Sequence, residues 1–448
     1  MQSCEITITG LSHDGQGVGR LADGQVVFVP DLLPGERALV RIEPAARRHR
    51  VLTGQCLQRL QDSPQRRRPP CILADHCGGC SLQHLSADGQ LSSKHDTVAQ
   101  VLQRIAHLKV VPEPVLASPN ELGYRNRTVI PLERADSGAL RAGFYRRSSH
   151  KIVNMNHCPV LDPRLDALVA PIKADLDATE WPVDRHLSQG GGLRHLALRV
   201  GHHSGEVLIT LIASHGPDAF AGLQQLAQSW LQRWPQVVGV LLNLQDKPTN
   251  ALFGPATELI AGRQWLSESF CSLRFQLACD TFFQVNTPQA ERVAAQLLQQ
   301  LPKPGCHVVD AYCGVGTFAL PMAAAGHHVQ GLEVHAGSVE LAQLNAQLNG
   351  LEQRARFVQG PVAEHLSALL SATDAVLVDP PRKGLDGPVR QALIEQPVQK
   401  LLYLSCDPAT LARDLEALVS GPYQLESLQP LDFFPNTSHI ECLAVLSS

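Results

Sequence analysis

The sequence predicts a multidomain chain: a small N-terminal β-barrel, a central α+β domain with a metal-cluster loop, and a C-terminal α/β domain built on a mostly parallel sheet. Its 448 residues correspond to about three domains of ordinary size. Short β segments separated by Gly and Pro turns fill the first 60 residues, whereas strands and helices alternate from about residue 280 onward. The first pattern is typical of an all-β barrel, and the second is typical of a doubly wound sheet.

The composition excludes a disordered or membrane-spanning chain. Hydrophobic residues make up 44% and charged residues 18%, an ordinary globular balance that allows a sizeable core. No apolar stretch reaches the roughly 18 residues that a membrane span needs. The N-terminus also lacks a basic segment followed by an apolar core. We therefore expect a cytoplasmic protein that makes no membrane contact.

Basic residues are concentrated in two stretches, although the net charge is −4. Residues 37–68 contain nine arginines against Glu43 and Asp62, and residues 125–151 contain seven basic residues against two acidic ones. Such stretches are either solvated faces or phosphate contacts, and two of them that consist mostly of arginine favour contact with a nucleic acid.

The spacing of four cysteines predicts a metal centre. Twelve cysteines in a chain without an export signal indicate a reducing compartment, where clustered thiols serve metal binding or catalysis. Cys71, Cys77 and Cys80 form a C-x5-C-x2-C pattern, and the glycines between the last two allow close wrapping of a metal. Cys158, which precedes Pro159, is the candidate for the fourth thiolate. The spacing suits both zinc and an iron–sulfur cluster and does not decide between them.

Local patterns predict most elements of the first and last domains. We expect barrel strands at 5–9, 25–29, 37–42 and 50–54, and a helix from 91 to 108 in which apolar residues recur at helical spacing. A glycine-rich run at 15–19 is followed by a hairpin rather than a helix, which argues against a phosphate-binding loop. In the last domain we expect strands at 307–310, 329–333, 374–379 and 400–405, with helices at 318–325 and 338–348. The ligand site of such a sheet lies at the carboxyl ends of its strands.

A glycine loop and an acidic residue at two of these strand ends indicate a nucleoside site. The loop runs from Asp310 to Thr317, and Glu333 ends the next strand, where a carboxylate can bind a ribose diol. The Gly-x-Gly turn is shorter than the loops that hold a pyrophosphate, so S-adenosylmethionine fits it. Further along the chain, Asp379 and Cys406 follow two more strands and place a carboxylate and a thiol at the same edge.

Five segments together closely resemble the RNA uracil-5-methyltransferases. They are Phe-Phe-Gln-Val-Asn at 282–286, the glycine loop at 310–317, Asp-Pro-Pro-Arg-Lys-Gly at 379–384, the Tyr-x-Ser-Cys-x-Pro segment at 403–414, and Phe-Pro-Asn-Thr-Ser-His-Ile-Glu at 434–441. The resemblance implies a Rossmann-like class I methyltransferase domain, a [4Fe-4S] cluster on the four cysteines and an OB-like TRAM domain in the first 60 residues. The branch with both extras resembles the 23S rRNA enzymes that modify uracil 1939.

The resemblance also implies the roles of individual residues. Cys406 is the expected nucleophile and Glu441 the expected base. This agrees with uracil chemistry, because a thiolate that adds to C6 activates C5 for methylation, and a base must then remove the C5 proton. The residues expected around S-adenosylmethionine and uracil are Gln284, Tyr312, Gly314, Thr317, Glu333, Pro361 and Asp379. Those expected on the cluster are Cys71, Cys77, Cys80 and Cys158.

From these observations we expect three domains: a TRAM barrel at 1–60, a central domain at 61–270 and a methyltransferase domain at 271–448, on which the helix at 91–108 packs. The expected partner is RNA, 23S rRNA first, and the expected state is a monomer. Tyr124, Arg125 and Arg127 are candidate RNA contacts by residue type. Two alternatives stay open: the same chemistry on a tRNA or another rRNA uridine, and an RNA-binding module with a vestigial methyltransferase fold. The intact Cys406 and Glu441 argue against the second.

Overall fold

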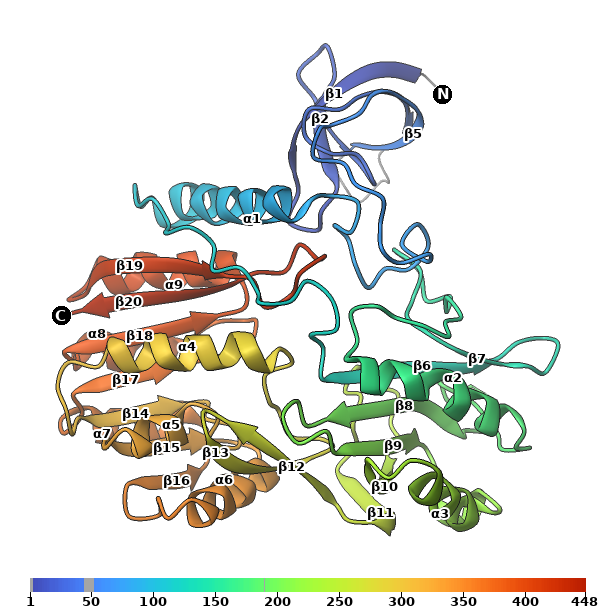
Figure 1. The fold of residues 1–448 in the computed structure, drawn as a ribbon. Coiled ribbons are helices and arrows are strands. Elements are labelled where there is room, and N and C mark those ends of the chain that lie inside the picture. The colour runs from blue at the N-terminus through green and yellow to red at the C-terminus, as the bar shows by residue number, and fades with distance from the viewer. Residues whose placement is uncertain (1–2, 44–51, 189) are drawn as a thin grey trace.

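The computed structural model describes residues 3–43, 52–188 and 190–448. Figure 1 shows a small barrel at the top, a central sheet at the right and a larger C-terminal sheet at the left, with a long helix lying between the barrel and the C-terminal sheet. No helix within the described ranges is both long and apolar enough to cross a membrane. All twelve cysteines lie in these ranges, and each carries a free thiol.

The N-terminal segment forms a closed five-stranded barrel in the order β1-β2-β3-β5-β4. Its apolar residues alternate along the strands, so that Ile6, Ile8, Val27 and Val29 fill the interior. The glycines of β2 serve this packing, because a Cβ on Gly19 would lie 2.3 Å from a methyl of Ile6. The predicted strand at 50–54 lies partly outside the described residues. The strands are β1 (Ser3–Leu11), β2 (Gly17–Arg20), β3 (Val26–Val29), β4 (Arg37–Glu43) and β5 (Leu52–Gln61).

A buried carboxylate joins the barrel to the segment that follows it. Glu36, whose side chain is fully buried, accepts hydrogen bonds from the Leu33 and Ser63 amides at 2.9 and 3.2 Å. Its Oε1 also accepts from Arg66 Nε at 2.5 Å. Burial raises the pKa of Glu36, but these hydrogen bonds outweigh it and hold the pKa below its ordinary value.

The central region is a six-stranded sheet in the order β11-β10-β9-β8-β6-β7, in which only β9 and β10 run parallel. Its core contains Trp230 of α3 and the apolar side of α2. A two-stranded hairpin then leads to the C-terminal sheet. The elements are β6 (Arg127–Arg134), β7 (Leu140–Ala142), α2 (Pro163–Asp177), β8 (Leu193–Val200), β9 (Val207–Ala213), α3 (Leu223–Arg233), β10 (Val237–Leu244), β11 (Ala256–Gly262), β12 (Trp265–Phe270) and β13 (Leu273–Ala278).

The C-terminal sheet has seven strands in the order β16-β15-β14-β17-β18-β20-β19, and the first five run parallel. One face packs against α4, α5 and α6, and the other against α7, α8 and α9, as a doubly wound sheet requires. The elements are α4 (Thr287–Gln299), β14 (His307–Ala311), α5 (Ala319–Ala324), β15 (His328–Glu333), α6 (Ala336–Leu348), β16 (Ala355–Gln359), α7 (Val362–Leu370), β17 (Ala375–Val378), α8 (Gly387–Glu395), β18 (Lys400–Ser405), α9 (Pro408–Val419), β19 (Gln424–Leu431) and β20 (Glu441–Ser447).

Helix α1 (Ala87–Val101) crosses from the barrel to the C-terminal sheet (Figure 1). It begins four residues before the predicted start, because the Ser86 side chain caps it by accepting from the Gly89 amide at 3.2 Å. A π-helical turn at Leu102–Ala106 follows it. Val98 and Leu102 are buried against residues of α9 and β19, so this helix adds to the core of the C-terminal domain.

We predict that Glu36→Gln loosens the barrel in a pH-dependent way. The folded-state pKa lies below the ordinary value of 4.5, so the stabilisation is complete at pH 7 and is lost as the pH falls through the folded-state pKa. Hydrogen exchange of barrel amides should show an opening free energy about 1.5–3 kcal/mol lower than in the wild type at pH 7. The difference should shrink below pH 4.5. Glu5→Gln, which breaks the exposed pair with Arg37, is the matched control and should cost less than about 1 kcal/mol.

Candidate active site

The candidate site lies at the carboxyl edge of the C-terminal sheet. Glu333 ends β15, while Tyr312, Asp379 and Cys406 follow directly after β14, β17 and β18. β20 runs in the opposite direction, so it begins at this same edge with Glu441. The fold therefore brings together residues from five separate segments, as the parallel strand order predicts.

Cys406 and Glu441 are neighbours across the sheet. Ser405 pairs with Cys442 in the antiparallel ladder of β18 and β20, and the next residue on each strand is Cys406 and Glu441. Burial, together with the carboxylates of Glu441 and Asp379, raises the pKa of Cys406 to about 11, while Arg382 opposes this rise. The half-buried thiol is therefore protonated at neutral pH.

Three carboxyl groups lie at this thiol and the adjoining strand ends: Asp310 and Glu441 are buried, and Asp379 is half-buried. Burial raises the pKa of Asp379 to about 7. Burial and the Asp379 charge also raise the pKa values of Glu441 and Asp310 well above their ordinary range. The Gln284 side chain lies beside this group, with its Nε2 donating to Asp379 Oδ2 at 3.5 Å.

Two oxygens of this group have no hydrogen-bond partner in the described part of the chain. They are Oδ2 of Asp310 and Oε2 of Glu441, and both side chains are almost fully buried. Leaving a buried carboxylate oxygen unpaired is costly, so such atoms are concentrated where a ligand supplies the missing donor. The edge is thus a polar site prepared for a ligand that carries hydrogen-bond donors or positive charge.

The glycine loop is closed onto the carboxylate of Glu333. Glu333 Oε2 accepts from the Gly314 amide at 3.1 Å, and its Oε1 accepts from the His335 amide at 2.7 Å. The loop needs left-handed backbone at Tyr312 (φ 70°) and Gly314 (φ 55°), a conformation that favours glycine at the second position. One carboxylate is therefore held at the mouth of the loop in a fixed orientation.

The remaining predicted cofactor residues border the same edge. The Gly360 amide donates to the backbone oxygen of Glu333 at 2.9 Å, which places Pro361, the cap of α7, next to the end of β15. Thr317 is buried just before α5. Burial raises the pKa of Tyr312 to about 12.

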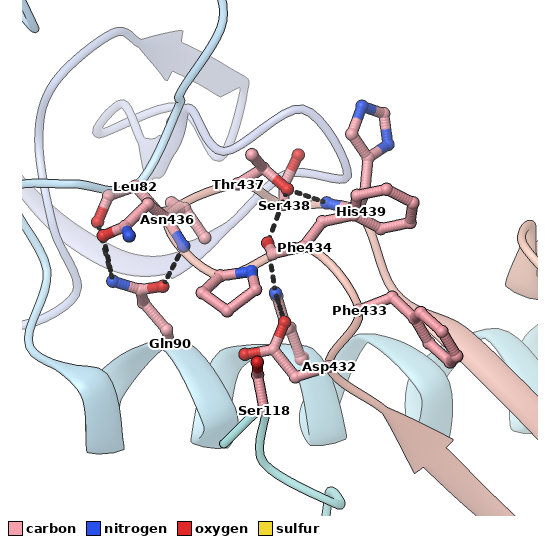
Figure 2. Close-up of polar contacts among 12 residues, drawn as sticks. Leu82, Gln90, Ser118, Asp432, Phe433, Phe434, Asn436, Thr437, Ser438 and His439 are labelled. Atoms are coloured by element: carbon pink, nitrogen blue, oxygen red, sulfur yellow. Dashed lines mark hydrogen bonds and ion pairs between the residues drawn. The ribbon is translucent and has the colours of Figure 1, made fainter. Parts of the chain in front are cut away.

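The loop that leads to Glu441 is fixed by α1 and by the segment after the cysteines (Figure 2). Asn436, which has left-handed backbone (φ 69°), is fully buried. Its amide donates to Gln90 Oε1 at 2.7 Å, and its carbonyl accepts from the Leu82 amide at 2.9 Å. Its side chain accepts from Arg67 and donates to the Glu121 carbonyl, each at 2.8 Å. Four segments distant in the sequence thus hold one residue of this loop.

A buried ion pair holds the other end of the loop. Lys94 Nζ lies 2.6 Å from Asp432 Oδ1, and both side chains are less than a tenth exposed. The same ammonium donates to the Phe434 carbonyl at 3.1 Å. Further along, the Ser438 amide donates to the Ser81 hydroxyl at 3.0 Å. The approach to Glu441 is therefore built by the N-terminal half of the chain as much as by the sheet.

The four predicted metal-ligating cysteines lie in one region outside this edge. Burial raises the pKa values of Cys77, Cys80 and Cys158, and each of these thiols is also raised electrostatically by at least one other thiol of the set. Backbone amides of Leu73 and Gly79 donate to the sulfurs of Cys71 and Cys77, each at 3.4 Å. No group of three or more His, Cys, Asp or Glu side chains within residues 3–43, 52–188 and 190–448 has an arrangement that holds a metal ion.

Sequence reasoning missed several residues of the site. Asp310 was read only as the start of the glycine loop, although a carboxylate at a strand's carboxyl end is itself a signal. Lys94 lies inside the predicted helix and Gln90 just before its predicted start, and nothing in the local sequence points to their partners more than 300 residues away.

Two of the three predicted RNA contacts have structural roles. Tyr124 is buried, and its hydroxyl donates to the Pro435 carbonyl at 3.1 Å. Arg127 donates to the carbonyls of Cys279 and Thr281 at 2.9 and 3.2 Å.

Comparison with known proteins finds relatives described as RNA methyltransferases that align with nearly the whole chain. Residues 263–448 match the family described as tRNA (uracil-5-)-methyltransferase, and residues 2–57 match the TRAM domain. An RNA methyltransferase of Parasynechococcus marenigrum, described as uncharacterized, is 49% identical over 99% of this chain and 95% of its own length. A relative with the same description in Thermosynechococcus vestitus is 46% identical over 99% of this chain and 98% of its own.

A solved structure is similar over the full length. The crystal structure of the Pyrococcus abyssi tRNA (uracil-54, C5)-methyltransferase, in complex with S-adenosyl-L-homocysteine, matches with a TM-score of 0.76 at 25% identity. The match covers 99% of this chain and all of that one. The barrel, the central sheet and the C-terminal sheet are thus shared with that enzyme.

We predict that the Lys94 and Asp432 pair stabilises the C-terminal domain only as a pair. Lys94→Met leaves a buried carboxylate without its partner, so the free energy of unfolding should fall by about 3–5 kcal/mol. Urea denaturation followed by circular dichroism measures this. Lys94→Met combined with Asp432→Leu should recover most of the loss. Lys303→Met, which breaks an exposed pair with Asp374, is the control and should leave the free energy of unfolding close to that of the wild type. A single-variant loss no larger than that of the control would show that the buried pair contributes little.

Proposed function

This chain belongs to the RNA uracil-5-methyltransferase family, and on that premise we propose that it methylates C5 of one uridine in 23S rRNA, uracil 1939, through a covalent adduct with Cys406. The observation that carries the proposal is the pairing of a thiol and a carboxylate, Cys406 and Glu441, at the carboxyl edge of the sheet. Methylation at C5 of uracil needs these two groups, a nucleophile for C6 and a base for the proton on C5.

The residues at the edge fit S-adenosyl-L-methionine. When bound, this cofactor supplies a methyl group on a positively charged sulfonium. The fixed carboxylate of Glu333 suits the ribose hydroxyls, and the glycine loop at Tyr312 and Gly314 allows close approach of the ligand. The unpaired oxygen of Asp310 suits a positively charged or hydrogen-bond-donating part of the ligand. Thr317 and Pro361 border the same space, the latter where an adenine would approach backbone.

Cys406 acts first in the proposed sequence. Its Sγ forms a bond to C6 of uracil, and the thiol proton passes to a carboxylate of the surrounding group as that bond forms. Asp379, whose pKa is about 7, is the carboxylate best matched to exchange a proton at neutral pH. The C5=C6 electron pair shifts toward C5 and O4, which makes C5 the nucleophile that takes the methyl group. Asp379 and Gln284 hold the edge of the uracil during this step.

Glu441 completes the sequence. Its carboxylate removes the proton from C5, the C5=C6 double bond forms again, and the bond between C6 and Sγ breaks to release the cysteine. The raised pKa of Glu441 makes its ionised form a stronger base than an exposed glutamate. The rigid loop between Asp432 and Glu441 keeps this base in register with Cys406.

Two kinds of RNA are candidate targets. A TRAM barrel together with the four cysteines supports the 23S rRNA branch. The structurally similar archaeal enzyme is described as acting on tRNA, which supports a tRNA uridine as the second candidate. Mapping 5-methyluridine in the rRNA and tRNA of a deletion strain separates the two, because only the true target loses its modification.

We further propose that Cys71, Cys77, Cys80 and Cys158 hold a [4Fe-4S] cluster. The donor chemistry supports this, since four thiols lie in one region and backbone amides donate to two of the sulfurs, as is common around cluster ligands. The side chains of the described residues are not themselves arranged as a metal site, so cluster binding would have to draw the four sulfurs together. When bound, the cluster would crosslink the cysteine segment to the start of α2. Methyl transfer requires no electron, so its proposed role is structural.

Trapping the covalent adduct tests the proposed roles of Cys406 and Glu441 separately. Cys406→Ala should form no adduct and transfer no methyl group. Glu441→Gln should still add and methylate, but it should lose the C5 proton slowly, because an amide cannot accept it. A denaturing gel of protein with labelled RNA should therefore show a shifted band for Glu441→Gln on normal RNA and for the wild type on 5-fluorouridine RNA.

The control is Cys313→Ala, since Cys313 is the thiol of the glycine loop after β14 at the same edge. It is buried in the core beside Gly331, so its loss should leave the shifted bands in place. An adduct that survives in Cys406→Ala and disappears in Cys313→Ala would overturn the assignment of the nucleophile.

The metal content of the purified protein tests the proposed [4Fe-4S] cluster. Protein purified without oxygen should be brown and contain about four irons per chain, as a four-cysteine cluster implies. Cys158→Ala should lose the iron and the colour. Cys271→Ala, which removes a half-buried cysteine elsewhere, should keep both. Stoichiometric zinc without iron in the wild-type protein would show that the site is a zinc site.

A further inference from the structure

Two adjoining cavities lie in the central domain, outside the candidate active site. One has a volume of about 580 Å³ and the other about 790 Å³. They share three lining residues, Arg146, Ser149 and His150. None of the residues assigned to methyl transfer lines either cavity, so the proposed function leaves them without a role.

A tight hairpin forms the wall between the cavities. Tyr145 pairs with Ile152, and the Arg146 amide donates to the Lys151 carbonyl at 2.8 Å. The Gly78 amide, in the cysteine segment, donates to the Tyr145 carbonyl at 2.8 Å. The hairpin is thus held at its base and presents its side chains to the cavities on both sides.

The smaller cavity combines aromatic and apolar walls. Phe144 and Tyr145 line it together with Val129, Pro131 and Leu252. The guanidinium carbon of Arg185 lies 5.0 Å from the centre of the Tyr145 ring, which fixes the ring from one side. An aromatic ring held in this way is a platform on which a planar group can stack.

A buried histidine, His195, also lines this cavity. Nδ1 of His195 has no hydrogen-bond partner in the described part of the chain, and the side chain is only 6% exposed. Burial, together with the charges of Arg194 and Arg185, lowers the pKa of His195 to about 4, so the ring is neutral. A neutral imidazole nitrogen at the wall can make one hydrogen bond to the polar edge of a ligand.

The larger cavity is cationic and has spare positive charge. Arg141 and Arg185 lie within 4 Å of Glu133, the one acidic residue that lines it. Arg146 and Lys151 are exposed, and neither has a carboxylate partner among the residues that the structure describes. Two free cations beside an aromatic cavity favour an anionic ligand that carries a planar group.

We propose that these cavities bind an unpaired nucleotide of the RNA substrate, with its base in the smaller cavity against Tyr145 and its flanking phosphates on Arg146 and Lys151. This rests on RNA being the substrate of the proposed function. Single-stranded RNA offers an unstacked base and adjacent phosphates, which is the combination that the two cavities suit. A paired duplex keeps its bases stacked and cannot place one in a cavity. The site would therefore select RNA with an open loop at a fixed distance from the methylated uridine.

The test measures RNA binding in the full-length Cys406→Ala chain, so that methyl transfer plays no part. The probe is a fluorescein-labelled 12-nucleotide oligouridylate, followed by anisotropy at several salt concentrations. Tyr145→Ala should weaken binding about ten-fold, because it removes a stacking platform, and Tyr145→Phe should restore binding to within about two-fold. Arg146→Ala combined with Lys151→Ala should lower the slope of log Kd against log salt by about 1.4, which corresponds to two phosphate contacts on a single strand. Arg104→Ala, an exposed arginine after α1 that does not line these cavities, is the matched control and should change neither value.

Crosslinking is a second measurement, and it needs no substitution in the hairpin that could unfold the protein. The same oligonucleotide with 4-thiouridine, irradiated on the otherwise unaltered Cys406→Ala chain, should crosslink to the peptide that contains Tyr145. Crosslinks confined to the barrel or the C-terminal domain, or an unchanged Kd in a folded Tyr145→Ala, would overturn the proposal. A phosphopeptide and unlabelled oligouridylate are each added as competitors before irradiation. If the phosphopeptide prevents the crosslink and the oligouridylate does not, the nucleotide site is overturned in favour of a site for a protein partner. If the wild type methylates no uridine while Tyr145→Ala still weakens RNA binding, only the proposed function fails.

Discussion

The antiparallel pairing of β20 with β18 places Glu441 beside Cys406, and most of the structure around the site serves to keep that register. Five strands of the sheet are parallel, so their carboxyl ends meet at one edge without further help. β20 must arrive at this edge from the opposite direction, through the loop after Asp432. A one-residue slip would turn Glu441 to the other face of the sheet. The buried Asn436 and the pair of Lys94 with Asp432 prevent that slip by fixing the loop at both ends.

The burial that raises the pKa values of the site's ionisable groups also lowers the stability of the fold. The carboxyl groups of Asp310 and Glu441 are removed from water, and one oxygen of each lacks a partner in the described chain. Each unpaired buried polar atom costs about 1–3 kcal/mol, which is a large fraction of a typical domain's stability. The packing of α1 on the C-terminal domain compensates by adding Val98 and Leu102 to its core. The N-terminal half of the chain is thus part of the framework of the site, and not only a carrier of RNA-binding surface.

Local sequence patterns predicted the features that one segment determines by itself, such as the bounds of a strand and the residues at its end. The strand at Lys400–Ser405 has the predicted bounds, and Asp379 and Cys406 lie at one edge because parallel strand ends always meet there. The contacts of Gln90 and Lys94 with the loop before Glu441 could not be predicted, because they join residues 346 and 338 positions apart and neither residue breaks the helical pattern around it. Whether Tyr124 and Arg127 are free for RNA was equally hidden, because residue type does not reveal burial.

Charge counted along the sequence points to two basic stretches, and the structure shows carboxylate partners for cations of both. Among the described residues of the first stretch, Arg66 pairs with Glu36 and Arg67 with Glu121, which neutralises part of the local positive charge within the fold. In the second stretch, the hairpin cation Arg147 pairs with Asp31 of the barrel. That pair ties the barrel to the hairpin at the smaller cavity, which Arg147 lines. The hairpin therefore joins a contact with the barrel at Arg147 to Arg146 and Lys151, which have no carboxylate partner among the described residues and on which we propose that phosphates bind.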